Sequence, residues 1–252
     1  MDLLFEIRDG IGFVTLNRPE ARNALTFGMY ERLSEISVDP GGARALVISG
    51  AGERAFAAGT DIGQFRDFRT AEDGIAYEAR LDRVLGALER CAVPVIAAVS
   101  GACTGGGAGI AAACDLRIAA VGARFGFPIA RTLGNCLSIA NVARLAALIG
   151  PGRVTEMIFT ARLLGAEEAL AVGLVTEVLP DFAALMARAE ALARLVAGNA
   201  PLTLRATKEG LRRLREALPA DEDLVRMCYG SEDFREGMEA FLGKRAPVWK
   251  GR

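Results

Sequence analysis

The sequence predicts an α/β fold in which helices cover a largely parallel sheet. Strand-like and helix-like segments alternate up to about residue 200, and the pattern beyond it is helical. The run 93–100 is almost continuously apolar, as expected of a strand that is buried on both faces. With 52% hydrophobic and 24% charged residues, the chain can bury a large core. Alternating strands and helices favour parallel pairing, because each helix returns the chain across the sheet.

The first half of the chain begins with a predicted hairpin. Two short strands are joined at Asp9-Gly10, a typical hairpin turn. Thr26 can cap a helix that runs through Ser37, and Asp61 can cap a short helix. The remaining patterns predict strands at 3–8, 11–17, 45–49 and 93–100, a loop at 50–60 and a helix at 72–90.

The second half is predicted to be mostly helical. Gly105 opens a helix that ends near Asp115, and a strand follows at 116–120. One further strand is expected at 174–178. Helices are predicted at 137–149, 152–160, 166–172, 182–198, 201–217, 221–229 and 232–242.

Composition excludes several classes of chemistry. The chain has no histidine, which removes Ser-His-Asp and Cys-His catalysis and histidine-ligated metals. Its net charge is −1 and its charges are scattered, so neither nucleic acid nor an anionic membrane is an expected partner. Five cysteines without CxxC spacing are typical of free thiols in a reducing compartment, which predicts a cytoplasmic protein. We therefore expect no disulfide framework.

No membrane segment or signal peptide is predicted. The uncharged stretch 91–114 contains Pro94 and five glycines, and most of its apolar residues are alanine. A membrane-spanning helix needs about 20 strongly apolar residues. The N-terminus lacks a basic run followed by an apolar stretch. The stretch 91–114 is better interpreted as a buried strand followed by a helix that begins in glycines.

Two glycine-containing turns follow buried strands, at 57–61 and 101–107. The second contains three consecutive glycines, 105–107, at the start of a helix. Glycines there let a ligand approach the backbone, whose first-turn N–H groups lack helical partners and lie at the positive end of the helix dipole. Such a turn suits an oxyanion or a phosphate. Alternatively, the glycines only permit close packing; a nucleotide site is disfavoured, since GxGxxG and GxxxxGK[ST] are both missing.

The segment PVIAAVSGACTGGGAGIAAACDLRIA, residues 94–119, resembles the signature of the crotonase superfamily, the enoyl-CoA hydratase/isomerase group. Other matches to the family follow in the same order along nearly the whole chain. They are Leu16-Asn17-Arg18-Pro19, Asn23-Ala24-Leu25, Phe56-Ala57-Ala58-Gly59-Thr60-Asp61-Ile62, Phe125-Gly126-Phe127-Pro128, Gly165-Ala166-Glu167-Glu168-Ala169, Gly173-Leu174-Val175 and Arg235-Glu236-Gly237-Met238-Glu239-Ala240-Phe241. Each piece is common, but the ordered set is specific.

The resemblance implies a ClpP/crotonase-like spiral of ββα units over 1–200. A helical region, 201–252, would pack against partner subunits in a homotrimer or a dimer of trimers. The implied ligand is an acyl-CoA thioester, with coenzyme A as part of the substrate, no other cofactor and no metal. The implied oxyanion hole consists of the backbone N–H groups of Thr60 and Gly106, which would hold the thioester carbonyl.

The chain departs from the family at two positions. Hydratases of this family carry one glutamate three residues after the central glycine of GGG and another after FGxP; here these positions are Gly109 and Ile129. Neither can move a proton, as hydration requires. The following segment, 129–138, is expected to line the pocket without a carboxylate. In it, Arg131 could hold a substrate carboxylate, or equally form an ion pair or face solvent.

The resemblance also implies the residues that surround the ligand. Phe241 and Lys244 would reach the ligand of a neighbouring subunit. Asn135, Cys136 and Ser138 could orient water, although loop or cap hydrogen bonds are the simpler role. For Tyr77, Glu78 and Arg80, on a helix beside the acyl pocket in the family, a solvated face is the default and a substrate role is the alternative. The implied substrate-binding set is Ala21, Arg22, Ala58, Asp61, Ile62, Gly105, Gly109, Ile129, Asn135, Ser138, Phe241 and Lys244.

Three functions remain open. The favoured one is an acyl-CoA enzyme that uses the oxyanion hole without the hydratase glutamates, as in decarboxylation, which forms an enolate without a base. The second is a hydratase or isomerase with a relocated acid or base, which a carboxylate near the pocket would support. The third is a non-catalytic acyl-CoA-binding subunit, which a blocked pocket would support.

Overall fold

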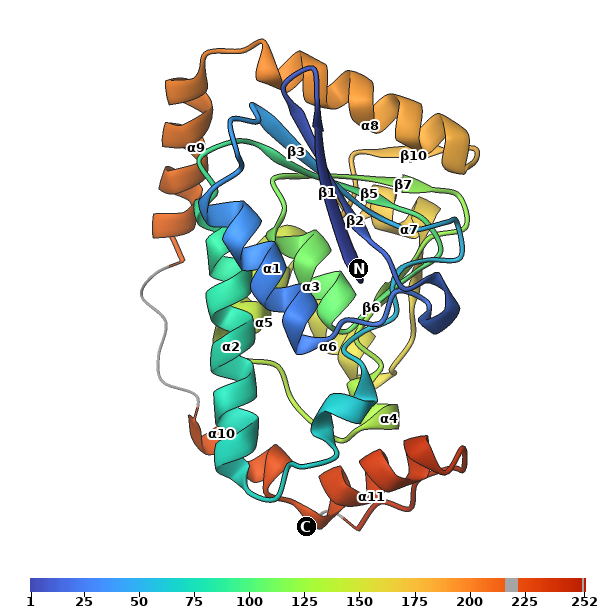
Figure 1. The fold of residues 1–252 in the computed structure, drawn as a ribbon. Helices are drawn as coiled ribbons and strands as arrows, with labels where there is room; N and C mark the ends of the chain where they lie inside the picture. The colour runs from blue at the N-terminus through green and yellow to red at the C-terminus, as the bar shows by residue number, and fades with distance from the viewer. Residues whose placement is uncertain (216–221, 251) are drawn as a thin grey trace.

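A computed structural model describes residues 1–215, 222–250 and 252. Its larger sheet has six strands in the order β1-β2-β3-β5-β7-β10 (Figure 1). β1 and β2 form the predicted antiparallel hairpin, and the other neighbours pair in parallel. The strands are β1 (Leu3–Arg8), β2 (Ile11–Leu16), β3 (Ala45–Gly50), β5 (Val95–Val99), β7 (Leu116–Ala120) and β10 (Glu177–Leu179).

A second sheet of four short strands, in the order β4-β6-β8-β9, was not predicted. These strands are β4 (Ala55–Ala57), β6 (Ala102–Thr104), β8 (Arg124–Gly126) and β9 (Leu164–Gly165). At two or three residues each, they are too short to show alternation in the sequence.

Three times, a strand of the large sheet turns into a strand of the small sheet, and a helix follows. The turn between β5 and β6 requires glycine: Gly101 has φ 62, and a Cβ there would lie 2.1 Å from the Arg54 carbonyl oxygen. This repeated ββα unit confirms the expected α/β crotonase-like spiral.

Helices cover both faces of the large sheet. α8 (Phe182–Ala197) lies across one face, where Leu185 and Leu192 pack against apolar residues of β2, β3, β5 and β7 (Figure 1). On the other face, the main core includes side chains of α1 (Phe27–Val38), α2 (Ala71–Arg90) and α3 (Gly106–Ala113). Thr26 caps α1 and Asp61 caps η2 (Ile62–Phe65), both as predicted.

The remaining helices agree with the sequence pattern within a few residues. The exceptions are two short helices, η1 and α4, that were not predicted and the expected strand 174–178, of which only the end belongs to β10. Residues 216, 217 and 221 of the predicted helices lie outside the described residues. The helices are η1 (Pro19–Ala21), α4 (Ile129–Thr132), α5 (Ile139–Ile149), α6 (Pro151–Phe159), α7 (Ala166–Ala171), α9 (Pro201–Arg213), α10 (Glu222–Tyr229) and α11 (Glu232–Leu242).

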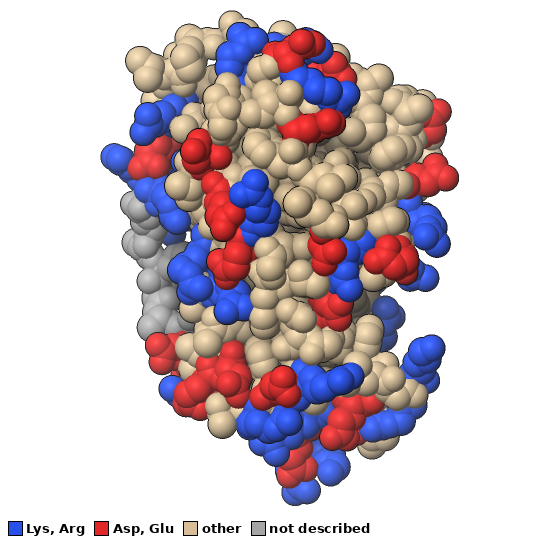
Figure 2. Space-filling model, viewed as in Figure 1, with Lys and Arg blue, Asp and Glu red and all other residues tan. Residues whose placement is uncertain are grey.

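The C-terminal helices follow the length of α2. α9 and α10 both contact α2, at opposite ends, and α11 crosses below to contact α4 and η2 (Figure 1). Lysines, arginines, aspartates and glutamates are interspersed on the face in Figure 2 and gather over α10 and α11. None of the described helices is long and apolar enough to cross a membrane.

Candidate active site

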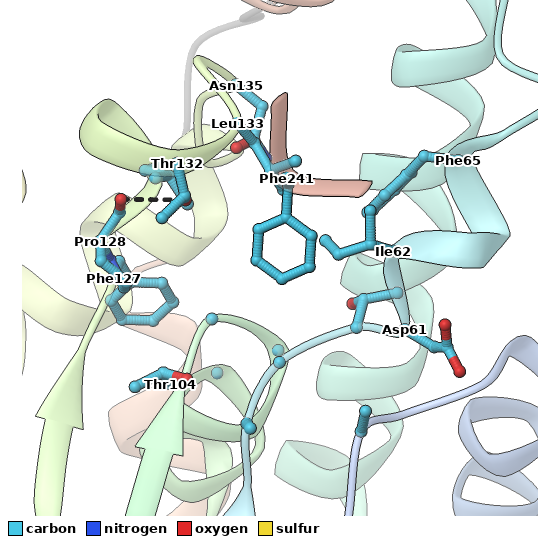
Figure 3. Close-up of a pocket in the computed structure, with 18 of the residues that line it drawn as sticks. Asp61, Ile62, Phe65, Thr104, Phe127, Pro128, Thr132, Leu133, Asn135 and Phe241 are labelled. Carbon is cyan, nitrogen blue, oxygen red and sulfur yellow. Dashed lines mark hydrogen bonds between the residues drawn. The ribbon is translucent and has the colours of Figure 1, made fainter. Parts of the chain in front are cut away.

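A cavity of about 620 Å³ lies where the two predicted glycine turns meet. Its walls come from the turn after β4, the start of α3, one side of α2, the segment after β8, and α11 (Figure 3). The lining is mostly apolar, with a few polar groups, as is usual for a small-molecule site.

Left-handed glycines bring the two turns face to face. Gly59 has φ 106 and Gly105 has φ 51, and a Cβ on Gly105 would lie 3.5 Å from the Gly59 Cα. The next residues, Thr60 and Gly106, both line the cavity. Within the described part of the chain, no acceptor is found for the backbone N–H of either residue. These are the two donors predicted for the oxyanion hole, and Gly106 is also the first residue of α3, at the positive end of its dipole.

Three hydroxyl groups cluster beside the start of α3. The Tyr30 hydroxyl lies 2.8 Å from Thr60 Oγ1, which lies 2.7 Å from the Tyr77 hydroxyl. A Cβ on Gly106 would lie 1.9 Å from the Tyr30 hydroxyl oxygen, so only glycine fits there. Desolvation by burial raises the pKa of both tyrosines well above the ordinary value of 10.0, so both hydroxyls stay protonated. Sequence reasoning missed Tyr30.

The two positions of the family glutamates both lie in the cavity. Ile129 is buried and lines the cavity as an apolar residue. A Cβ on Gly109 would meet Leu85 Cδ1 at 3.3 Å and Asn141 Oδ1 at 3.9 Å. The two positions therefore have the expected location, and neither supplies a proton.

A carboxylate does line the cavity, and it belongs to Glu78, which is only 3% exposed. It accepts hydrogen bonds from the Tyr229 hydroxyl (2.6 Å) and from the Ser138 N–H (3.1 Å). The default prediction of a solvated face is therefore wrong for Glu78 and for Tyr77. The sequence spacing could have predicted that Glu78 is buried. Glu78 precedes two buried leucines, Leu81 and Leu85, by three and seven residues, which places all three on one helix face.

The segment 129–138 lines the cavity only in part. Ile129, Thr132 and Leu133 face inward, while Arg131 is exposed on the opposite side of α4 and outside the lining. Residues three or four apart on a helix share a face, whereas residues two apart do not. The expectation that Arg131 lies in the pocket is therefore wrong.

The polar residues at the end of this segment have structural partners. Ser138 Oγ caps α5 by accepting from the Asn141 N–H (3.2 Å) and donates to Asp82 (2.7 Å). Ser138 does not line the cavity, contrary to expectation. Asn135 does line it, and its amide donates to the Tyr229 hydroxyl (3.1 Å).

The predicted coenzyme A region forms another part of the wall. Ala21, Arg22 and Ala58 line the cavity, and the Ala58 N–H donates to the Arg22 carbonyl (3.0 Å). Ile62 and Asp61 line it too, but Asp61 accepts from the Gly63 N–H (3.0 Å) and pairs with Arg18 (2.9 Å). Its carboxylate points away from the cavity centre in Figure 3, as a cap residue would.

Phe241 and Lys244 lie differently with respect to the cavity of their own chain. The Phe241 ring lies in the cavity of its own chain, between Ile62 and the α4 side (Figure 3). Lys244 is exposed and does not line the cavity. α11 therefore supplies part of the cavity wall of the chain that contains it.

Few charges line the cavity. Among the described lining residues, Arg22 is the one cation, and Asp61 and Glu78 are the two carboxylates. The described residues contain no group of three or more His, Cys, Asp and Glu that could hold a metal ion. The geometry therefore offers two backbone donors, a hydroxyl cluster and one buried carboxylate around an apolar chamber.

Comparison with known proteins gives consistent results. A family model described as enoyl-CoA hydratase/isomerase matches residues 6–252. A short-chain-enoyl-CoA hydratase of Clostridium acetobutylicum is 35% identical, covering 97% of this chain and 95% of its own. The structure of an enoyl-CoA hydratase/carnithine racemase from Magnetospirillum magneticum is 35% identical, with TM-score 0.80, and the match covers 100% of this chain and 96% of that one. A methylmalonyl-CoA decarboxylase in complex with 2-nitronate-propionyl-CoA is 28% identical, with TM-score 0.90, and the match covers 100% and 99%.

Proposed function

The chain belongs to the enoyl-CoA hydratase/isomerase family, and from this premise we propose that it stabilises the enolate of an acyl-CoA thioester between the N–H groups of Thr60 and Gly106. The carrying observation is that both N–H groups line one cavity and neither finds an acceptor among the described residues. An enolate oxygen would accept hydrogen bonds from both N–H groups. One such donor lowers the free-energy barrier by about 3 kcal/mol.

The reaction that we favour is proton transfer by Glu78, as in an isomerase with a relocated acid or base. Glu78 supports this because it is the buried carboxylate in the lining, whereas Gly109 and Ile129 carry none. Decarboxylation of a substrate with a second carboxylate would need a cation to neutralise that carboxylate. Arg131 was the candidate for this cation, and it lies outside the cavity. The cavity is also open, so the blocked pocket expected of a binding-only subunit is not observed.

Decarboxylation is the second candidate, and the similarity to a methylmalonyl-CoA decarboxylase favours it. The two can be separated with Glu78→Gln. Under the favoured reaction, this change lowers the exchange of acyl-CoA α-protons in D2O by about 100-fold or more, the usual contribution of general acid–base catalysis. Carbon dioxide release from malonyl-type thioesters that survives Glu78→Gln would instead support decarboxylation.

The oxyanion hole itself is tested with Gly106→Val. The new side chain would displace the Tyr30 hydroxyl, so acyl-CoA binding or turnover should be lost. Gly122→Val is the matched control, since a Cβ there meets nothing within 4 Å and leaves the cavity untouched. A bound acyl-CoA whose carbonyl faces away from Thr60 and Gly106 would refute the proposal.

We also propose the family's trimeric or hexameric assembly. Leucines on and beside α9 support it, since Leu202, Leu211 and Leu214 are 76%, 60% and 83% exposed and a second copy could bury them. Light scattering at micromolar concentration measures the assembly directly, and a monomer would contradict the proposal.

A further inference from the structure

The hydroxyls of Tyr30, Thr60 and Tyr77 cluster beside Gly106, one of the two proposed donors to the enolate oxygen. Thr60 Oγ1 lies 3.1 Å from the position of a Cβ on Gly106, and Thr60 is itself one of the two backbone donors. Thr60 and Tyr77 line the cavity, while Tyr30 is fully buried behind them. An oxyanion hole made of the two backbone donors alone assigns no role to these three hydroxyls.

Counting protons shows what the cluster can offer a ligand. A hydroxyl donates one hydrogen bond and accepts up to two. Among the described residues, Tyr30 can donate only to the oxygens of Thr60 and Tyr77. If Tyr30 donates to Thr60 and Thr60 donates to Tyr77, the proton of Tyr77 is left over. Without a ligand, that proton can return to Tyr30 and close a ring of three hydroxyls; an oxyanion in the cavity would compete for it.

The pKa shifts indicate a fixed donor rather than an acid. Burial raises the pKa of Tyr77, and the neighbouring Tyr30 and Glu78 raise it further, so loss of its proton is unfavourable. Tyr30 has no exposed surface from which a lost proton could be replaced. A donor that keeps its proton but shares it with developing negative charge is the chemistry of an oxyanion hole.

The Tyr77 ring is held firmly in place. Phe65 meets it edge-on, with ring centroids 4.9 Å apart, and Phe68 does so at 6.1 Å. Tyr229 and Phe27 pack at 6.3 Å and 6.1 Å. Because the ring is packed on several sides, its hydroxyl needs little reorganisation when charge develops, which is the source of an oxyanion hole's advantage over water.

We infer that Tyr77 is a third donor of the oxyanion hole, with its hydroxyl directed to the enolate oxygen by Thr60 and Tyr30. This rests on the proposed function, because it assigns a further donor to the same enolate. Tyr77 would be a catalytic residue, Tyr30 would act through it as a positioning residue, and the side chain of Thr60 would link the two.

Acetoacetyl-CoA provides a test that needs no knowledge of the natural reaction. This β-keto thioester forms an enolate that absorbs in the ultraviolet, so a pH titration of its complex reports the enolisation pKa of the bound ligand. The wild-type protein should lower that pKa relative to free ligand. Tyr77→Phe should raise it by about 2–3 pH units from the wild-type value, since one donor contributes roughly 10²–10³-fold. Binding of the keto form at low pH should change less than about threefold.

Comparing single and double variants distinguishes a hydrogen-bond donor from a residue with only a structural role. Tyr30→Phe should produce a smaller rise, and the double variant should match Tyr77→Phe, because Tyr30 acts only through Tyr77. Ser37→Ala is the control, since it removes a buried hydroxyl of α1 that donates to the Leu33 carbonyl and lies outside the lining. The enolisation pKa should not change in this control.

Two results would overturn the inference, and each differs from failure of the proposed function. One is an enolisation pKa that is lowered by the wild type and equally by Tyr77→Phe. The other is a crystal structure of the wild-type enolate complex in which the Tyr77 hydroxyl lies beyond hydrogen-bonding distance of the enolate oxygen; we expect about 2.5–2.7 Å. If the wild type itself does not lower the pKa, the proposed function fails.

Discussion

Gly109 and Ile129, the positions at which the sequence resemblance places the two family glutamates, both line the cavity without a titratable group. Glu78 is a carboxylate of the same cavity but approaches it from α2, two helical turns from the leucine that Gly109 faces. The reaction that the site supports therefore depends on the position at which a single carboxylate reaches the cavity.

Hydration of crotonyl-CoA should therefore be slow. The expected rate lies well below about 10 s⁻¹, a typical turnover for a metabolic enzyme, and loss of enone absorbance measures it. Gly109→Glu with Ile129→Glu should raise the rate, because the nearest atom to a Cβ on Gly109, at 3.3 Å, is Leu85 Cδ1, the end of a flexible side chain that can shift to admit the new residue. A wild-type rate of 10 s⁻¹ or more would contradict the prediction.

The five thiols divide into two kinds. Burial raises the pKa of Cys91 and Cys103, and that of Cys114 to about 12. A hydrogen bond from the Cys136 thiol lowers the pKa of Cys228 to about 7, and both of these residues are only half-buried.

Iodoacetamide should therefore alkylate Cys228 first. Its rate should rise with pH around a midpoint of about 7, because the thiolate is the nucleophile. Cys136→Ala should move the midpoint toward the ordinary value of 9.0, since the hydrogen bond is lost. Peptide mass spectrometry over a pH series identifies the site; faster labelling of Cys91 would argue against this assignment.

At the scale of elements, the contact between α2 and α10 connects the C-terminal helices to the site. The Tyr229 ring packs on Gly74, where a Cβ would lie 2.2 Å from the ring carbon Cγ. From that position the Tyr229 hydroxyl reaches Glu78 at 2.6 Å. The glycine in α2 thus determines how closely α10 approaches, and through Tyr229 it positions the carboxylate.

Gly74→Val should force α10 away from α2. Overpacking of this kind typically costs about 1–3 kcal/mol, and thermal or urea unfolding measures it. Gly210→Val in α9 is the control, because it makes the same substitution in a helix where a Cβ meets nothing within 4 Å. Equal losses in the two variants would attribute the effect to helix propensity and not to the packing of Tyr229.

At the scale of the whole molecule, buried ion pairs connect elements that are distant in sequence. Glu89, whose side chain is 13% exposed, bonds to Arg144 at 2.8 Å and to Arg215 at 2.8 Å. Burial alone would raise the pKa of Glu89, but the two arginines outweigh it and lower the pKa. The Glu89 carboxylate thereby links α2 to α5 and to the segment after α9.

Glu89→Gln should lower stability by about 1–3 kcal/mol at pH 7, the usual cost of weakening such hydrogen bonds. A carboxyl with a lowered pKa in the folded state contributes fully above its unfolded pKa, about 4.3, and loses that contribution as pH falls through the folded pKa. Urea unfolding of both proteins at pH 7 and below pH 4 checks this. The difference in unfolding free energy between the two proteins should shrink at low pH. A difference that is the same at both pH values would exclude this effect of the Glu89 pKa on stability.

The sequence by itself determined the features that depend on local pattern. The hairpin at Asp9-Gly10, the caps Thr26 and Asp61, and the turn residues Thr60 and Gly106 could all be predicted, because each depends on neighbouring residues. The family also followed from motifs whose order along the chain is sufficient evidence.

Tertiary structure alone decided which side chains meet. Tyr30 joins Thr60 across 30 residues, and Glu78 joins Tyr229 across 151. Arg131, in a segment expected to line the pocket, turns outward on α4. Helical spacing shows which residues share a face, but not which face is buried. That depends on the elements packed against it. Here α10 returns from the end of the chain to pack on α2, and α11 supplies part of the cavity wall.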